Sequence, residues 1–377
     1  MTPACAEHDV DTVLRGRGTI VCGMSSSPRF RRIATAAVSA LVLLALLVVG
    51  TQVQVPYAAL GPGPTLNTLG MTKVEQDGKV VERKVVQIDG APLDKTTGNL
   101  NLTTVSVSDG LTLFDALGMW MSGKYALTPR DEVYPPDRST EQVQQENAQQ
   151  MAGSEEDATV AALRFLDRPT VLRIAAVGAD GPSADVLRAG DVVTRAGGVE
   201  VETSKELRDV VSKNPPGTVL PLEVVRQGTP QTVTVTLAPH PGDEKAGFLG
   251  VTAEVANADP SLEVTYTVGD IGGPSAGMML ALSVVDQLSP GELTHGKFIA
   301  GTGTISADGD VGPIGGITHK TRAAHDAGAT VFLVPARNCA EAVSDRPDGL
   351  ELVKVETLDG AVDALDAIGS GRPAPSC

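Results

Sequence analysis

A long uncharged segment near the N-terminus constrains this chain more than any other feature of its sequence. No charged residue occurs between Ile33 and Thr72, and the stretch from Ile33 to Val49 is almost wholly aliphatic. Continued to Val55, the apolar run has about 20 residues, and a helix of that length, at about 1.5 Å per residue, crosses a hydrocarbon core of about 30 Å. The sequence therefore predicts a transmembrane helix over residues 33–55.

Charged residues beside this segment indicate its orientation. Arg29, Arg31 and Arg32 come immediately before the apolar run, and no cationic residue follows until Lys73. Because cationic residues concentrate on the cytoplasmic side, we expect residues 1–32 in the cytoplasm and everything after Pro56 outside the cell membrane. A cleaved signal peptide is the alternative, but no convincing cleavage site of small residues follows the run.

Composition bounds the partners of the remaining chain. At 377 residues the chain has room for two or three domains, and aromatic residues make up only 3%, too few to stack on many bases. Nucleic acid is therefore not an expected partner. Four cysteines without a C-x-x-C pair, together with five scattered histidines, do not indicate a metal site, and no cofactor is expected.

Residues 65–169 combine strand and helix patterns. Lys79–Ile88 and Gly98–Val107 contain the clustered or alternating β-branched residues that are typical of strands. Ser139–Leu166, rich in Gln, Glu and Ala, predicts a solvated helix broken around Gly153. This β-rich and helical segment belongs to the following domain or is inserted in it.

From Thr170 the pattern changes to short elements separated by turns. Strands are expected at 170–177, 219–226 and 231–237, and helices at 183–188 and 204–212. The series, especially Gly181-Pro-Ser-Ala184, Leu187-Arg-Ala-Gly-Asp191 and Gly197-Gly-Val199, resembles a PDZ domain of the bacterial protease-associated type over residues 170–240. The resemblance implies that an extended peptide adds to one edge of the sheet.

The loop that would bind the peptide carboxylate is not found where it is expected. No Gly-hydrophobic-Gly sequence stands just ahead of Thr170. If residues 106–168 are an insertion, Gly98, Leu100 and Leu102 of Gly98-Asn-Leu-Asn-Leu102 would supply the loop and the peptide-binding strand. A structural spacer that binds no peptide is the alternative.

A serine precedes a helix that is apolar on nearly all faces. The stretch from Gly269 to Gly277 leads into Met278–Leu288, which is expected to be a buried helix. Ser275 lies at its N-terminus, where free N–H groups and the helix dipole would stabilise an oxyanion. The hydroxyl would still need a base to become a nucleophile.

A lysine on the helix expected from Ile317 to Ala327 is the candidate base. At helical spacing, Lys320 shares a stripe with Ile317 and three alanines, whereas His319, Arg322 and Asp326 share another stripe. Burial on the apolar stripe disfavours the ammonium, and lowering a lysine pKa from about 10.4 towards 7 needs roughly 4 to 5 kcal/mol of differential interaction. A neutral Lys320 could then deprotonate Ser275.

These two stretches together strongly resemble the proteolytic domain of Lon proteases. The resemblance rests on Gly273-Pro-Ser-Ala-Gly277 and on Lys320, which stands 45 positions after Ser275 in Gly312-Pro-Ile-Gly-Gly-Ile-Thr-His-Lys320. The resemblance covers residues 247–368 and implies a catalytic dyad of Ser275 and Lys320, with Gly273 in the serine loop and Thr302 orienting the lysine. It departs from the family at Gly272 and Thr304, where acidic residues are usual.

The order of anchor, PDZ unit and proteolytic domain resembles membrane-anchored, PDZ-containing Lon-like proteases. The resemblance implies an α+β multidomain chain with a C-terminal α/β proteolytic domain, an ATP-independent serine endopeptidase activity on exported or membrane-associated proteins, and subunits that can assemble as a homo-oligomer. Gly291-Glu-Leu-Thr-His-Gly-Lys297 nearly matches a phosphate-binding loop, but Phe298 replaces the hydroxyl residue that would bind magnesium.

Two other functions remain open from the sequence. Gly273-x-Ser-x-Gly277 followed by Asp310 and His325 fits the residue order of an α/β-hydrolase esterase, although Pro274 is unexpected there. An adaptor that recruits exported proteins through its PDZ unit, with a non-proteolytic Lon-like domain for assembly, is a function of a different class.

The only cysteines on the expected outer side are Cys339 and Cys377. Oxidation is permitted outside the cytoplasm, and Cys377 is the last residue of the tail formed by residues 369–377. We therefore predict a disulfide between them, with two independent thiols as the alternative.

Overall fold

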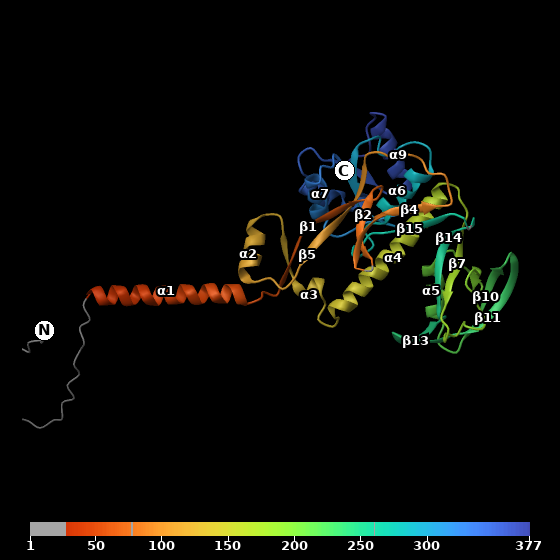
Figure 1. The fold of residues 1–377 in the computed structure, drawn as a ribbon, viewed down its shortest axis with the longest axis horizontal. Coiled ribbons are helices and arrows are strands. Elements are labelled where there is room, and N and C mark those ends of the chain that lie inside the picture. Colours follow the sequence, from red (N-terminus) through yellow and green to blue (C-terminus); the bar gives the residue numbers. More distant parts are fainter. Residues whose placement is uncertain (1–27, 77, 260) are drawn as a thin grey trace, which may run out of the picture. The chain divides into compact units, whose positions relative to one another are not determined.

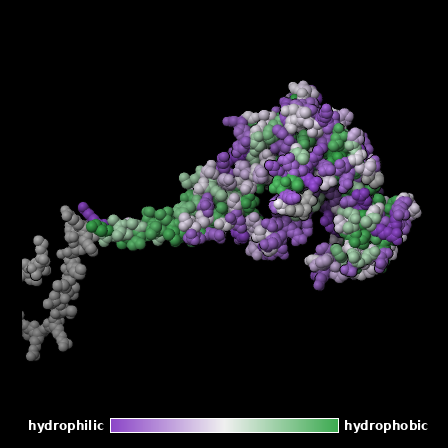
Figure 2. All heavy atoms as spheres, in the orientation of Figure 1, coloured by the Kyte–Doolittle hydropathy of each residue, from purple (hydrophilic) through white to green (hydrophobic). Residues whose placement is uncertain are grey.

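The structure, a computed structural model, describes residues 28–76, 78–259 and 261–377, which fall into two units divided between Val53 and Gln54. The first contains α1 (Pro28–Gln52), whose residues Arg32–Gln52 are long and apolar enough to cross a membrane, with a mean hydropathy of 2.6. Apolar side chains lie exposed along this helix (Figure 2). The helix ends three residues before the predicted Val55, and the expected cytoplasmic residues 1–27 lie outside the described residues.

The second unit contains a six-stranded mixed sheet in the order β20-β19-β16-β5-β1-β6, of which β1 and β5 are labelled in Figure 1. The strands β16, β19 and β20 run parallel to β5, whereas β1 pairs antiparallel with both β5 and β6. Their bounds are β1 Tyr57–Asn67, β5 Asn99–Ser108, β6 Ala126–Pro129, β16 Phe298–Gly301, β19 Val331–Pro335 and β20 Glu351–Val355.

Apolar side chains alternate between the two faces of this sheet. In β19, Val331 and Leu333 belong to the core on one face, whereas Phe332 and Val334 belong to the core on the other. The first face is covered by α6 (Gly277–Leu288), α9 (Leu358–Gly369) and the C-terminal half of α4 (Thr140–Phe165). The second is covered by α7 (Ile317–Asp326) and α8 (Cys339–Ser344). The sheet is therefore a central layer between helices.

The helix α4 differs from its prediction. It is continuous through Gly153, and its second half is not solvated, because residues 158 and 160–163 are buried against the core. The polar composition of the helix did not predict this burial, because the apolar residues that reach the core are Met151 and a group in the last turns.

Shorter elements complete this unit. A hairpin is formed by β2 (Met71–Gln76) with β3 (Lys79–Lys84), and β4 (Val86–Asp89) pairs antiparallel with the distant β15 (Glu263–Tyr266). A third pair joins β17 (Thr304–Ile305) and β18 (Val311–Gly312). Two short helices, α2 (Leu113–Met121) and α3 (Arg130–Val133), flank β6, and a 3-10 turn at Ala336–Asn338 precedes α8.

A separate sheet with its own core has the strand order β11-β10-β8-β7-β14, with β9 beside β8. The helix α5 (Ser204–Lys213) buries Leu207 and Val211 against it. The strands are β7 Thr170–Val177, β8 Val192–Ala196, β9 Val199–Glu200, β10 Val219–Arg226, β11 Thr229–Thr236 and β14 Val251–Asn257, and β12 (Ala238–His240) pairs with β13 (Asp243–Phe248) nearby. The short helix predicted at 183–188 is a series of turns.

Two predicted boundaries are wrong. Leu100 and Leu102 do not belong to the PDZ-like sheet, because they lie fully buried on β5 between β1 and β16. Residues 106–168 are therefore not an insertion in that sheet. The strand β14, expected to begin the proteolytic domain after residue 247, instead pairs with β7 at the edge of the PDZ-like sheet.

A disulfide joins Cys339 at the start of α8 to Cys377. The tail also pairs with the sheet through its backbone, since Lys354 N–H donates to Pro375 O at 2.8 Å and Cys377 N–H donates to Leu352 O at 3.2 Å. The C-terminal tail thus lies along β20, the edge strand of the six-stranded sheet.

Candidate active site and peptide groove

The chain turns sharply before α6 and presents Ser275 there. Gly273 has a φ of 85°, a left-handed conformation that glycine adopts without steric cost. Gly277 begins α6, and a Cβ at this position would lie 2.6 Å from Ser154 Oγ on α4. Sterics therefore explain why both positions are glycine in Gly273-Pro-Ser-Ala-Gly277. Gly273 allows the turn, and Gly277 allows α6 to pack closely against α4.

The helix α4 supports this turn through two hydrogen bonds. Gly273 N–H donates to Asn147 O at 2.9 Å, and Ser154 Oγ donates to Pro274 O at 3.1 Å. Asn147 and Ser154 could not be predicted, because nothing in a Gln- and Glu-rich helix distinguishes the residues that contact a distant loop. The serine loop is thus fixed from a segment more than 100 residues away.

Lys320 reaches Ser275 from the opposite side of the sheet. Lys320 is only 3% exposed. Its Nζ lies 2.7 Å from Ser275 Oγ, 2.9 Å from Thr302 Oγ1 and 3.1 Å from Thr103 O. The helix that carries it begins after Gly316, whose φ is 67°. The apolar stripe predicted for α7 is confirmed as far as Ala324, since Ile317, Ala323 and Ala324 are buried with the lysine, whereas Ala327 at the C-cap is exposed.

The Lys320 side chain lies beside β5 at the point where the neighbouring strand β16 ends. The last parallel pair between β5 and β16 is Leu102 with Gly301, and β16 does not continue. The next carbonyl on β5, that of Thr103, accepts its hydrogen bond from Lys320 instead of from a strand. A buried carbonyl needs a partner, so the lysine satisfies a backbone group as well as contacting the serine.

The corner at Thr302 and Gly303 fixes the backbone of the serine. Ser275 O accepts from Thr302 Oγ1 at 2.9 Å and from Gly303 N–H at 3.0 Å, and Met278 N–H donates to Gly303 O at 3.1 Å. One N–H at the start of α6 is thus already used. In the part of the chain that the structure describes, the N–H groups of Ser275 and Ala276 have no hydrogen-bond acceptor, so they are the donors available to an oxyanion.

Burial lowers the pKa of Lys320 from 10.5 to about 8, because desolvation disfavours the ammonium. In the neutral amine, two N–H groups can donate to Thr103 O and Thr302 Oγ1, which leaves the lone pair for the hydroxyl proton of Ser275. The contacts around Nζ therefore suit a lysine that acts as a base.

Ser275 and Lys320 open onto a groove of about 640 Å³. Its walls come from β5, from α4 and from the serine loop, and include Thr103, Val105, Asn147, Gln150, residues 270–276 and Gly315. Such a groove can accommodate an extended chain whose carbonyl reaches Ser275.

The residues of the esterase alternative do not meet at Ser275. His325 is exposed near the end of α7 and lies 3.7 Å from the carboxylate of Asp326, and Asp310 is exposed in the turn between β17 and β18. Among the described residues, neither side chain hydrogen-bonds with Ser275, and no group of three or more His, Cys, Asp or Glu could hold a metal ion.

A second groove, of about 500 Å³, lies between α5 and β14 in the PDZ-like sheet. The strand β14 is the edge strand, so its outer backbone groups can pair with an added peptide strand. Gly247-Phe-Leu-Gly250 lines one end of the groove and leads directly into β14. Gly250 has a φ of 71°.

This glycine loop was not predicted, because the strand order expected for the PDZ-like sheet puts it ahead of Thr170. Its signal was visible as two glycines around hydrophobic residues followed by a strand pattern, within Gly247-Phe-Leu-Gly-Val251. The strand order explains the error, since the edge strand of the groove comes last in the sequence and not first.

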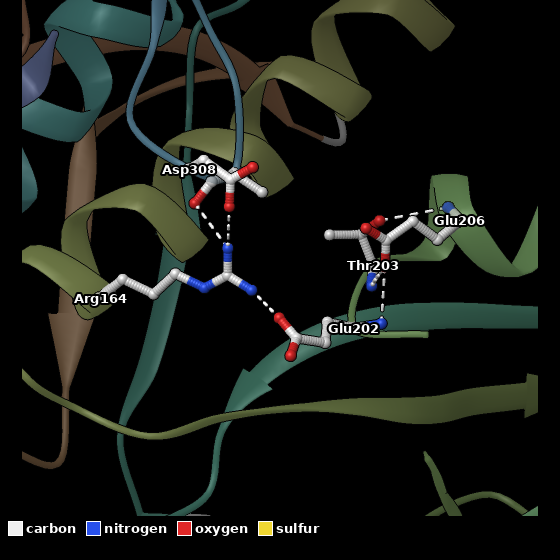
Figure 3. Close-up of polar contacts among 6 residues, drawn as sticks. Arg164, Glu202, Thr203, Glu206 and Asp308 are labelled. Carbon is white, nitrogen blue, oxygen red and sulfur yellow. Dashed lines mark hydrogen bonds and ion pairs between the residues drawn. The ribbon is translucent and has the colours of Figure 1, made fainter. Parts of the chain in front are cut away.

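The groove between α5 and β14, called the peptide groove below, is linked to the Ser275 site through α4. Glu156 accepts hydrogen bonds from Ser204 N–H at 2.9 Å and from the Ser204 hydroxyl, at the first residue of α5. Arg164 pairs with Asp308, at 2.7 Å, and with Glu202, which stands next to the N-cap Thr203 of α5 (Figure 3). The same helix therefore contacts both the serine loop and the helix that lines the peptide groove.

Comparisons with known proteins agree with this division. Residues 143–237 match the PDZ domain family, and residues 262–366 match the Lon protease (S16) C-terminal proteolytic domain. The chain therefore contains a PDZ domain and a Lon-type proteolytic domain. The PDZ match ends before β14 and its glycine loop.

Several of the curated proteins that are similar to this chain are Lon proteases. An archaeal Lon protease of Methanothermobacter thermautotrophicus is 32% identical over 121 residues, which is 32% of this chain and 18% of the relative. Lon protease 2 of Bacillus subtilis is 31% identical over 109 residues, 29% of this chain and 19% of that protein, and Lon protease 1 of Sorangium cellulosum is 43% identical over 122 residues, 31% and 15%. The chain thus spans less than a fifth of each of these relatives.

Proposed function

We propose that this chain is a membrane-anchored serine endopeptidase that works without ATP or metal, with Ser275 as nucleophile and Lys320 as general base. The observation that carries the proposal is the buried amine of Lys320, 2.7 Å from Ser275 Oγ, with its pKa lowered to about 8. The Lon-type proteolytic domain supports the same assignment. Thr302 is the positioning residue, since it contacts both the amine and the backbone of the serine.

The proposed reaction has two halves, acylation of Ser275 and hydrolysis of the acyl-enzyme, and Lys320 takes up and returns one proton in each. As Ser275 Oγ bonds to the peptide carbonyl carbon, its proton moves to the lone pair of Lys320, and the carbonyl electrons move to oxygen, where the N–H groups of Ser275 and Ala276 stabilise the charge. Lys320 then gives the proton to the leaving amine as the C–N bond breaks. Water repeats the sequence on the acyl-enzyme, and Ser275 recovers its proton.

The test compares three alanine variants of the full chain. Ser275→Ala and Lys320→Ala are each expected to abolish peptide hydrolysis, because losing either partner removes nucleophile activation. His325→Ala is the matched control and should keep its activity. Circular dichroism checks that the variants stay folded. Activity retained by Lys320→Ala and lost in His325→Ala would overturn the dyad.

The PDZ groove is proposed to capture an extended segment of a protein substrate as an added strand beside β14. Thr252→Trp, an exposed position on β14 that lines the groove, should block this capture. Cleavage of a full-length protein substrate should then fall, while hydrolysis of a short peptide at Ser275 stays unchanged. Thr232→Trp, an exposed position on β11, is the control and should leave both reactions intact.

The anchor and the location are also proposals. The apolar α1 with Arg32 at its start supports a single membrane pass with the N-terminus in the cytoplasm and the catalytic unit outside. Substrates would then be exported or membrane-associated proteins. Protease added outside intact cells should remove the catalytic unit, and its protection until lysis would reverse this topology. A homo-oligomer is a further proposal, tested by the mass of the detergent-solubilised chain.

A non-proteolytic adaptor is the alternative, favoured by the well-formed groove beside β14. The two functions differ in the state of Ser275. A serine-directed covalent probe should label the unmodified chain at Ser275 and leave Ser275→Ala unlabelled, whereas absence of labelling in a chain that captures peptide would favour the adaptor.

A further inference from the structure

The short helix α2 exposes large apolar side chains. Its inner face packs into a small core, where Ala116 is buried with Ala59 and Leu111. Its outer face carries apolar side chains, whereas the solvent-facing side of a surface helix is ordinarily polar, and apolar residues are visible there in Figure 2. The exposed fractions are Leu113 50%, Phe114 41%, Leu117 45%, Trp120 62% and Met121 73%.

These side chains form one stripe on an ordered helix. Residues 113, 117, 120 and 121 follow the i, i+4, i+7, i+8 spacing of a single helix face. The helix has a defined start, because Thr112 and Asp115 form a reciprocal capping box. The stripe is therefore a fixed surface.

Backbone contacts join the start of α2 to the segment that follows α1. Val55 N–H donates to Leu111 O at 2.9 Å, and Gln54 forms a β-bridge with Thr112. The helix α1 ends at Gln52, and the three residues from there to Val55 extend at most about 10 Å. The polar layer of a bilayer is about 5 to 8 Å thick on each side. A membrane crossed by α1 is thus within reach of α2.

We propose that α2 lies in the interface of the membrane that α1 crosses and inserts its outer stripe into the boundary between headgroups and acyl chains. The inference rests on the anchoring proposed above. Five apolar side chains on one face of a short helix are typical of interfacial helices, and a tryptophan prefers this depth because its ring is apolar and its N–H polar.

The charges near α2 identify the chemistry of the lipid surface. Arg130 forms a bidentate pair with Asp109, in which Nε donates to Oδ1 and Nη2 donates to Oδ2, both at 2.9 Å, and Asp115 is the charged residue of the helix itself. Lys124, the exposed cation that follows the helix, is outnumbered by the carboxylates of Asp131 and Glu132, so the described residues around α2 have no excess of cations for anionic headgroups. Insertion therefore depends on apolar area, and α2 binds neutral phosphatidylcholine as well as anionic lipid.

The test uses the full chain reconstituted into phosphatidylcholine vesicles, because Trp120 is its only tryptophan. Its emission should be blue-shifted, weakly quenched by aqueous iodide and strongly quenched by lipids brominated near the headgroup end of the acyl chains. Leu117→Glu with Met121→Glu should reverse all three readings and leave hydrolysis of a soluble peptide unchanged. Both replaced side chains are exposed, so folding is not at risk.

The control moves the tryptophan to a surface away from α2. In Trp120→Phe with Val219→Trp, the indole stands on β10, where Val219 is 60% exposed, and should be open to iodide and unaffected by brominated lipid. If Trp120 is equally open to iodide, the proposal is wrong. Protection from iodide without quenching by brominated lipid would mean that a second copy of the chain covers α2, which also overturns it.

Vesicle flotation separates this outcome from failure of the anchor. A chain that floats with vesicles while Trp120 reads as aqueous refutes the interfacial helix alone. A chain that stays at the bottom of the gradient refutes the anchor and the interfacial helix together.

Discussion

The pH dependence of catalysis follows from the burial of Lys320. With a pKa of about 8, the lysine is neutral in about a tenth of the molecules at pH 7 and in about nine tenths at pH 9. Since only the neutral amine accepts the proton of Ser275, kcat/KM should rise about tenfold between these values and then level off. The shift from 10.5 corresponds to about 3 kcal/mol of unfavourable desolvation of the ammonium.

The assay is hydrolysis of a peptide without titratable side chains, measured from pH 6 to pH 10 on the full chain. An unperturbed lysine would give a rate that climbs tenfold per pH unit through pH 9 without a bend, and a base other than lysine would place the bend elsewhere. A flat profile between pH 6 and 9 would refute Lys320 as the base.

A substitution at Thr302 tests the environment of the amine in the same assay. Thr302→Val removes a polar contact to Nζ and a hydrogen bond to Ser275 O. The plateau should fall at least about tenfold, and the bend should move to lower pH because the ammonium loses a partner. Thr302→Ser keeps the hydroxyl and should keep the bend near pH 8. A wild-type plateau in Thr302→Val would remove the positioning role.

Three predictions concern stability, measured by chemical unfolding. The effect of Lys320→Met on the free energy of unfolding should be about 3 kcal/mol more stabilising at pH 7 than at pH 10.5, because a lowered lysine pKa destabilises the fold below about pH 8 and this penalty is lost as pH rises from 8 towards 10.5, whereas the hydrogen bond to Thr103 O is lost at every pH. Asp286→Asn should stabilise by about 1 to 2 kcal/mol at pH 8 and by little at pH 3, because burial raises the pKa of this carboxyl from 3.8 to about 6 and the penalty appears as pH rises through that range. Cys377→Ser should cost about 3 to 4 kcal/mol for a loop of 38 residues, and only without reductant; equal stability of both chains without reductant would disprove the disulfide.

The sequence was sufficient where one local pattern determines the element. The strands β7 and β10 begin and end where their alternation predicts, and the buried stripe with Lys320 follows from helical spacing in α7. It was insufficient for strand pairing, which depends on contacts between distant segments. A run such as Gly98–Leu102 suits the edge of either sheet, and only the pairing with Phe298–Gly301 assigns it to the proteolytic one.

The site shows the same limit. Ser275 and Lys320 were recognisable because their neighbours form motifs, and Thr302 followed from the resemblance to Lon. Asn147 and Ser154 act through one backbone carbonyl and one hydroxyl at the serine loop, and neither contact requires a distinctive local sequence. The peptide groove was misplaced for a related reason, since its edge strand follows its partner strands in the chain.

The end of β16 beside Thr103 has a consequence for when the enzyme becomes active. Before β16 joins β5, nothing excludes water from Lys320, and an ordinary lysine is protonated in all but about one molecule in 2,500 at pH 7. A chain whose sheet is incomplete therefore carries Ser275 without a base. If Ser275 and Lys320 act as proposed, completion of the sheet creates the base, and the activity appears only when the chain has folded.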